Sequence, residues 1–102
     1  MIHYIVTYAN EADSFFDFDY YQKTHLPMGD ELLGEFGLVK TTVERCLPDS
    51  RGNAPAFACV TRLYFEDRER MTAGFATHGE RLRDDIGNYT NVSPVFTLAE
   101  TL

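Results

Sequence analysis

The sequence has no tryptophan, only two cysteines and no long hydrophobic run, and each shortage excludes a class of protein. Cys46 and Cys59 are too few for a disulfide framework and lack the spacing of a metal-binding motif. The longest unbroken apolar run, residues 56–60, is far shorter than the roughly 20 residues of a membrane-spanning helix. The first residues carry no basic segment of a secretory signal, so we expect a cytoplasmic protein without a membrane segment.

Basic residues are also scarce: 9 Lys and Arg accompany 16 Asp and Glu, which gives a formal net charge of −7. This charge repels nucleic-acid phosphates and anionic lipid surfaces, so we expect neither as a partner. The 102 residues, 44% hydrophobic and 25% charged, have the length and balance of one globular domain spanning residues 1–102. Such a chain can bury a core without disulfides or a metal ion.

Hydrophobic patterning predicts four strands, each rich in strand-forming or alternating apolar residues: residues 2–8, 38–47, 56–65 and 92–99. The Pro-, Asp- and Gly-rich residues 48–53 predict a turn that joins the second and third strands as a hairpin. Pro94 places the beginning of the last strand at a sheet edge or bulge, because proline cannot donate to a ladder.

Two apolar stripes with steps of three and four predict helices. The first stripe runs over residues 18–36 after Asp17, a typical N-cap residue. Pro27 interrupts it, since proline lacks a donor and disfavours a helical Leu26. We therefore predict two helical pieces, with Pro27 near the first turn of the second, which ends at Gly34 and Gly37. The second helix follows Asp67, a possible N-cap, and its apolar stripe covers residues 71–86.

The resulting β-α-β-β-α-β order predicts a ferredoxin-like α+β fold, a four-stranded antiparallel sheet with both helices on one face. The other face also carries apolar residues, among them Ile5, Val60 and Val95, whereas a solvated face would alternate cleanly. We therefore expect a second copy of the chain to cover it in a symmetric dimer. The alternative is an exposed face that is incompletely polar.

Two separated motifs carry a resemblance to a known family. Residues 16–27 form the pattern FDxxYYxxxHxP, which resembles the opening motif of the EthD family. Residues 75–79 and 85–91, followed by Pro94, resemble the family's second helix and the approach to its last strand. Both motifs occur in the expected order and span nearly the whole chain. Gly87 is a departure, since a proline is expected there before the Asn-Tyr pair.

The resemblance implies a fold more firmly than a reaction. It implies the dimeric α+β barrel, in which two ferredoxin-like sheets meet. Related barrels include muconolactone isomerases, quinol-type monooxygenases, polyketide cyclases and heme-degrading proteins, many of which bind ligand between sheet and helices. The family is named for a protein associated with ethyl tert-butyl ether degradation, and its own reaction is poorly defined.

His25 and His78 are the main catalytic candidates, because imidazole suits proton transfer near neutral pH. Both lie on apolar stripes near the middle of antiparallel helices, so we expect their rings to face a common groove as an acid/base pair. Tyr89, at a junction of loop and strand, is predicted to donate a hydrogen bond to the substrate. The alternative is that both histidines are core residues, each satisfied by a carbonyl or a tyrosine.

Three further residues are predicted to contact a ligand: Tyr21, Phe75 and His3. Tyr21 and Phe75 lie on the helical stripes, and the resemblance draws attention to His3 because related cyclases use a histidine on the first strand. A packing role is the alternative for these residues. Asp85 lies two helical turns, about 10 Å, from His78, so we expect it to be solvated rather than its partner.

No glycine fingerprint, P-loop or HExxH motif is present, so neither a cofactor nor a metal ion is expected. The leading hypothesis is a small cofactor-independent enzyme that decarboxylates, isomerises or oxygenates an apolar aromatic or keto compound. The alternative is a non-catalytic small-molecule-binding or accessory protein in oxidative degradation. A third hypothesis is a heme-binding barrel with an axial histidine.

Overall fold

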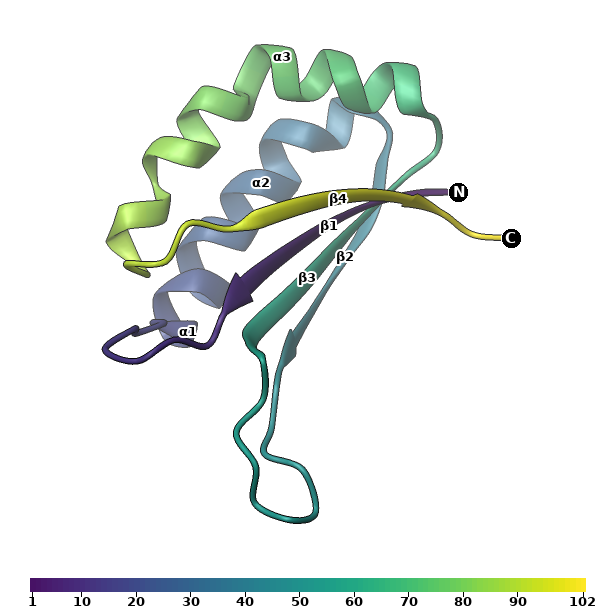
Figure 1. The fold of residues 1–102 in the computed structure, drawn as a ribbon. Helices are drawn as coiled ribbons and strands as arrows, with labels where there is room; N and C mark the ends of the chain where they lie inside the picture. The colour runs from purple at the N-terminus through teal and green to yellow at the C-terminus, as the bar shows by residue number, and fades with distance from the viewer.

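The structure is a computed structural model that describes all 102 residues. It consists of one antiparallel sheet with helices packed on one of its faces (Figure 1). The elements, in chain order, are β1 (Ile2–Ala9), α1 (Phe18–Tyr20), η1 (Tyr21–His25), α2 (Leu26–Leu33), η2 (Gly34–Phe36), β2 (Leu38–Arg45), β3 (Phe57–Phe65), α3 (Arg68–Asp84), η3 (Ile86–Asn88) and β4 (Val95–Glu100). The strand order is β2-β3-β1-β4. The predicted β-α-β-β-α-β order and the ferredoxin-like α+β fold are therefore confirmed.

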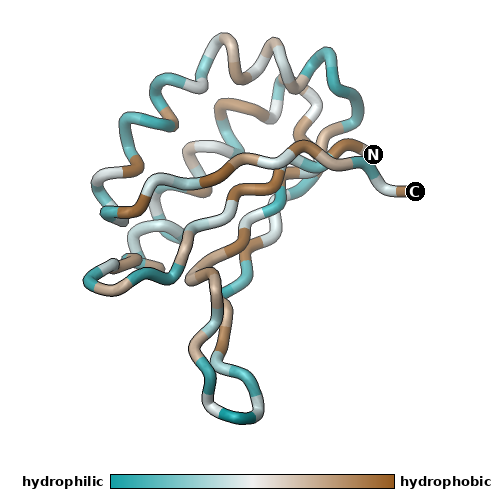
Figure 2. The backbone as a smooth tube through the Cα atoms, in the orientation of Figure 1, coloured by the Kyte–Doolittle hydropathy of each residue, from teal (hydrophilic) through white to brown (hydrophobic).

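The hairpin of β2 and β3 continues beyond the sheet as a long loop, which projects away from the body of the molecule (Figure 1). Its tip is hydrophilic (Figure 2), and the Asp49 carboxylate accepts hydrogen bonds from the backbone N–H groups of Arg51 and Asn53. Residues 48–53 thus form the predicted turn. No helix combines the length and the apolar character needed to cross a bilayer.

The first helical region departs from prediction at Pro27. Leu26 keeps helical dihedrals, with φ −63° and ψ −44°, and its N–H bonds to the carbonyl of Tyr21, five residues earlier. This widened turn, η1, ends just before the proline, so the helix accommodates the missing donor and continues into α2. The expected non-helical Leu26 is wrong, whereas Pro27 lies in the first turn of α2, as predicted. The predicted N-cap is also right: the Asp17 carboxylate accepts from the Tyr20 N–H at 3.0 Å.

The other predicted element ends hold within a few residues. Asp67 caps α3 by accepting a hydrogen bond from the N–H of Arg70 at 2.8 Å. β4 begins at Val95, directly after Pro94, and it lies at a sheet edge as expected. The start of α3 thus follows from the capping hydrogen bond of Asp67. The edge position of β4 follows from Pro94, which has no N–H to donate to a neighbouring strand.

Two buried clusters fill the space between sheet and helices. The tyrosine cluster consists of Tyr8, Tyr21, Tyr89, Val6 and Cys59. The aliphatic cluster consists of Leu33, Phe65 and Met71.

Close packing of α3 against the end of α2 encloses the aliphatic cluster. A Cβ atom on Gly74 would lie 2.8 Å from the Phe36 Cβ, so only glycine permits this approach. The two helices thereby acquire a fixed register.

Candidate functional site

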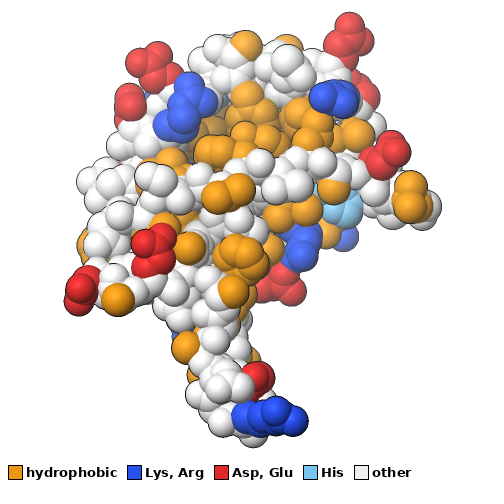
Figure 3. Space-filling model, viewed as in Figure 1, with side chains coloured by type: hydrophobic (Ala, Val, Ile, Leu, Met, Phe, Trp, Pro, Cys, Tyr) orange, Lys and Arg blue, Asp and Glu red, His pale blue; other side chains and the backbone are white.

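A cavity of about 80 Å³ lies between the sheet and the two long helices. Most of its lining is apolar, including Tyr4, Phe75, Leu82, Ile86 and Phe96. Hydrophobic side chains gather between α3 and β4, where this apolar interior reaches the surface (Figure 3). A largely apolar pocket with a few converging polar groups is typical of a small-molecule site.

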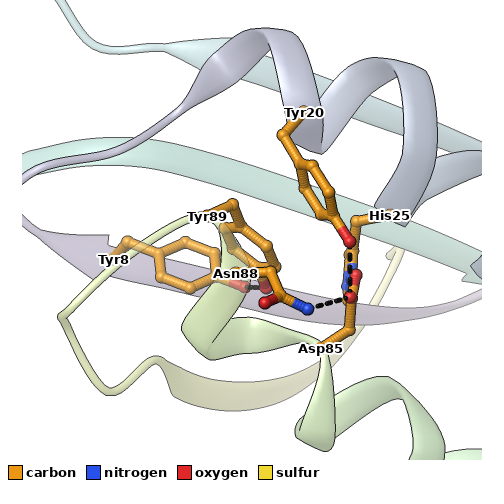
Figure 4. Close-up of polar contacts among 6 residues, drawn as sticks. All are labelled: Tyr8, Tyr20, His25, Asp85, Asn88 and Tyr89. Carbon is orange, nitrogen blue, oxygen red and sulfur yellow. Dashed lines mark hydrogen bonds and ion pairs between the residues drawn. The ribbon is translucent and has the colours of Figure 1, made fainter.

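His25, at the end of η1, supplies the one imidazole of the lining, and its partner is Asp85. The Nδ1 atom of His25 lies 2.8 Å from the Oδ2 atom of Asp85, and the side chains are only 12% and 13% exposed. The other carboxylate oxygen, Oδ1, accepts hydrogen bonds from the Tyr20 hydroxyl at 2.7 Å and the Asn88 amide at 2.9 Å. The side chains of His25, Tyr20 and Asn88 thus all converge on Asp85 (Figure 4).

These contacts set the charge of Asp85. Partial burial raises the pKa of its carboxyl, but hydrogen bonds from Asn88, Tyr20 and His25 outweigh burial and hold the pKa below its usual range. The carboxylate is therefore ionised at neutral pH and can only accept hydrogen bonds.

An ionised Asp85 fixes the tautomer of His25. Because the carboxylate accepts, Nδ1 of His25 carries the proton, and Nε2 of the neutral ring holds the free lone pair. No hydrogen bond occupies Nε2, and no buried side-chain nitrogen or oxygen lacks a partner, so Nε2 reaches accessible space. Nε2 can thus accept a proton from a bound molecule, as a histidine oriented by aspartate does in hydrolases.

Tyrosine hydroxyls occupy the cavity wall beside His25. The hydroxyls of Tyr8 and Tyr89 lie 2.6 Å apart, and that of Tyr21 lies 2.7 Å from the Thr61 hydroxyl. Burial raises the pKa of Tyr8, Tyr21 and Tyr89, so all three stay protonated at neutral pH. Tyr8 and Tyr89 share one hydrogen bond, which leaves one O–H hydrogen of the pair to donate to a ligand.

A backbone junction joins the two halves of this site, which are far apart in sequence. The Asp17 N–H donates to the Tyr89 carbonyl at 2.7 Å, and the Thr90 hydroxyl donates to the Phe15 carbonyl at 2.6 Å. Asn91 accepts from the Phe15 N–H at 3.0 Å. The loop before α1 and the loop after η3 are thereby held together, which brings one sequence motif against the other.

The structure gathers four of the six predicted site residues at the cavity: His25, Tyr21, Phe75 and Tyr89. The Tyr21 ring stacks on His25, with centroids 5.3 Å apart, and the Tyr89 ring is tilted against His25 at 4.7 Å. The Phe75 ring packs against the Tyr4 ring, with centroids 4.4 Å apart.

His78 does not line this cavity, and the structure does not bring it to His25. Its ring packs against Phe36, with centroids 5.7 Å apart. The antiparallel helices place Phe36 beside Gly74, which leaves His25 opposite Asp85. Phe36 lies three turns, about 16 Å, along the chain from His25.

His3 lies on the face of the sheet that the helices leave bare. It pairs across the strands with Tyr64, whose ring centroid is 4.2 Å away, and its Nε2 bonds to the Thr101 hydroxyl. The cavity and His3 are thus on opposite faces of the sheet.

Asp85 is the main residue that sequence reasoning placed wrongly, since it was expected to be solvated. It follows the last turn of α3, where chain reversal at η3 turns its carboxylate toward η1. Asn88 and Tyr20 were not predicted as partners of Asp85. One signal in the sequence could have indicated them: Tyr20 lies in the motif of residues 16–27, Asp85 and Asn88 lie in that of residues 85–91, and the fold brings these two motifs together.

The side chains around the cavity do not form a metal centre. No three His, Cys, Asp or Glu side chains converge as metal ligands. The cavity contains one histidine, His25, whose Nδ1 is hydrogen-bonded to Asp85 and whose Nε2 has no partner within the chain.

The chain resembles known proteins over nearly its whole length. The EthD domain model matches residues 11–93. The crystal structure of an EthD-like protein from Ralstonia eutropha JMP134 is 33% identical, with a TM-score of 0.91, and the alignment covers 97% of this chain and 89% of that one. No curated protein matches.

More distant structures share the fold. An ethyl tert-butyl ether degradation (EthD) family protein from Bacillus halodurans has 20% identity and a TM-score of 0.69, with 100% of this chain and 99% of that one covered. A putative antibiotic biosynthesis monooxygenase from Nitrosomonas europaea has 16% identity and a TM-score of 0.62, with the same coverage. At these identities the likeness concerns architecture alone.

Proposed function

The chain belongs to the EthD family, and we propose that it is a small enzyme that removes a proton from an apolar aromatic or keto compound without a bound organic cofactor. One observation carries this proposal: the His25 imidazole, oriented by an ionised Asp85, borders an apolar cavity with a free Nε2 lone pair. Proton abstraction is the first step of isomerisation through an enolate and of oxygenation of an electron-rich anion. In a decarboxylation, the protonated imidazole would instead return a proton to the enolate that loss of CO₂ leaves.

The roles follow from the contacts. His25 is the general base, and Asp85 is a positioning residue that stabilises the imidazolium formed when Nε2 takes the proton. Tyr89, with Tyr8, donates a hydrogen bond to the enolate or phenolate oxygen that develops. Tyr21 and Phe75 hold the apolar part of the substrate by contact.

Deuterium exchange tests the proposal. 1-Phenyl-2-propanone in D₂O loses its benzylic protons to solvent, and NMR follows the loss with and without protein. We expect the protein to accelerate exchange and His25→Gln to reduce the acceleration by about 100-fold or more. Arg51→Gln, at the tip of the hairpin loop, is the matched control and retains full activity. Equal acceleration by His25→Gln, or no acceleration at all, contradicts the proposal.

A binding protein without turnover is the second candidate, and one observation favours it. The hydroxyls of Tyr8, Tyr21 and Tyr89 are already hydrogen-bonded within the chain, and no buried side-chain polar atom lacks a partner. A lining satisfied in this way can hold an apolar molecule without acting on it. Ligand-induced NMR shifts at the cavity, together with no exchange, would support this candidate.

Assembly as a dimer belongs to the same proposal. The bare face of the sheet carries Ile5, Val60 and Val95, and Val95 is 61% exposed. A second copy would cover these side chains, and sedimentation would report the mass of the pair. Both cysteines are free, which agrees with the cytoplasm as the proposed compartment.

A further inference from the structure

One cationic side chain, that of Arg83, lines the cavity. It projects back along α3, so that its Nη1 atom lies 2.8 Å from the point where a Cβ atom of residue 79 would stand. Residue 79 is glycine, which leaves this space to the guanidinium. Gly79 is itself buried and forms part of the cavity wall, so the charge lies against that wall.

Arg83 has no acidic partner in the chain. Four ion pairs are present, Lys23–Asp19, His25–Asp85, Arg62–Glu44 and Arg70–Glu66, and none includes Arg83. It makes no side-chain hydrogen bond either, whereas Arg70 bonds both to Glu66 and to the Glu35 carbonyl. Its five N–H donors therefore remain available.

Tyr4 adds a second free donor to this part of the cavity. Its ring is held between Phe75 and Phe96, with centroid distances of 4.4 and 5.4 Å, and its hydroxyl has no hydrogen-bond partner. Burial raises the pKa of Tyr4, and the nearby charge of Arg83 opposes that rise. The hydroxyl thus remains a donor at neutral pH, within the field of the guanidinium.

The acidic groups around this point do not neutralise Arg83. Asp30 is the one carboxylate of the lining, and it lies on α2, where it accepts from the Thr41 hydroxyl at 2.8 Å. Asp85 is engaged by three donors. Glu80 and Asp84, the other acidic neighbours on α3, are exposed and make no ion pair with Arg83.

We propose that Arg83 and Tyr4 form a carboxylate-binding subsite, so that the substrate is an aromatic or keto acid rather than a neutral compound. This inference rests on the proposed function for the reacting end of the molecule. The guanidinium donates two parallel N–H groups to the carboxylate, and the Tyr4 hydroxyl donates a third hydrogen bond. The apolar part then occupies the wall formed by Phe75, Leu82 and Ile86, beside His25.

Two probes that differ in one group test the subsite: phenylpyruvate and 1-phenyl-2-propanone, in which a methyl group replaces the carboxylate. NMR titration gives a Kd for each. We expect the protein to bind phenylpyruvate about tenfold more tightly, because a charge-assisted pair is lost with the carboxylate. Arg83→Gln abolishes that preference and Arg83→Lys retains part of it. Arg81→Gln, on the same helix but outside the cavity lining, leaves the preference intact.

The two proposals fail in different ways. His25→Gln keeps the preference for phenylpyruvate, because the subsite does not include the imidazole. A preference that depends on Arg83, without proton exchange, supports the subsite and removes the proposed reaction. Equal binding of the two probes, no binding of either, or a preference unchanged in Arg83→Gln overturns the subsite, whatever the exchange assay shows.

Discussion

The two buried clusters between the sheet and the helices differ in how their side chains are packed. The aliphatic cluster, around Leu33 and Phe65, contains no polar side-chain atom and is closed by the contact of Gly74 with Phe36. The tyrosine cluster, around Tyr21 and Tyr89, brings hydroxyl groups into the core and satisfies each of them. The first arrangement gains stability from burial alone, while the second also depends on hydrogen-bond geometry.

The difference indicates where chemistry is possible. A hydroxyl or imidazole in the aliphatic cluster would lack a partner, which is costly inside a protein. The tyrosine cluster already contains paired donors, and the junction of Asp17 with Tyr89 holds them rigidly. His25 and Asp85 lie at this end, whereas His78 lies beside Phe36 at the other.

The largest expected effect compares the two histidines. His25→Gln should lower the rate of proton exchange by about 10² to 10⁴, because a positioned base contributes that much. His78→Gln should change it less than about threefold, since the ring contacts Phe36 and not the cavity. Exchange rates of the two variants, measured beside circular dichroism spectra, decide the matter. Equal losses of exchange rate in the two variants would instead support the acid/base pair of His25 and His78 that the sequence predicts.

The next effect compares the two clusters by stability. Leu33→Ala should lower the free energy of unfolding by about 3 kcal/mol, because Leu33 is fully buried among apolar side chains. Tyr8→Phe should cost only about 1 kcal/mol, the usual net value of a hydrogen bond, since it leaves the ring in place. Urea denaturation measures both. A larger loss for Tyr8→Phe would show that the hydroxyl network, and not burial, dominates the core.

A smaller effect separates the subsite from stability. Gly79→Ala should raise the Kd for phenylpyruvate several-fold, because the new Cβ would displace the Arg83 guanidinium. It should also stabilise the helix by about 0.5 to 1 kcal/mol, since alanine is the better helix former. Gly34→Ala, with open space around its Cβ position, is the control that leaves ligand binding unchanged. Tighter binding of phenylpyruvate by Gly79→Ala would contradict the assigned position of Arg83.

The fold was predictable because its signals are local. Asp17 and Asp67 each cap a helix through the backbone three residues onward, and Pro94 precedes an edge strand. The break in the helix expected before Pro27 is absent, because a widened turn at Tyr21 accommodates a proline that a regular helix would not. Periodicity reports which residues face the sheet, but not how wide a single turn is.

The site was predictable only in part, because it depends on the register of two helices. Sequence patterning placed His25 on the buried face, and its place in the cavity agrees with that. Its partner is decided by where α3 crosses the first helical region, and that crossing is fixed by the contact of Gly74 with Phe36. A shift of two turns would have placed another residue than Asp85 beside His25.

The smallest effect concerns the pH dependence of the Asp85 network. Hydrogen bonds hold the pKa of Asp85 in the folded chain below the value of about 3.9 expected in the unfolded chain. Between these two values the unfolded chain binds more protons, so acidification favours unfolding. The stabilisation is complete above the unfolded value and is lost as the pH falls through the folded one.

Asp85→Asn tests this dependence against Asp84→Asn, a neighbouring exposed carboxylate outside the network. The difference in unfolding free energy between the unaltered chain and Asp85→Asn should be constant near neutral pH and should shrink below about pH 4. Thermal unfolding at a series of pH values measures it. A difference that instead grew on acidification would mean that Asp85 is protonated more readily in the fold. Nδ1 of His25 would then lose its ionised acceptor, and the tautomer that leaves Nε2 free would no longer be fixed.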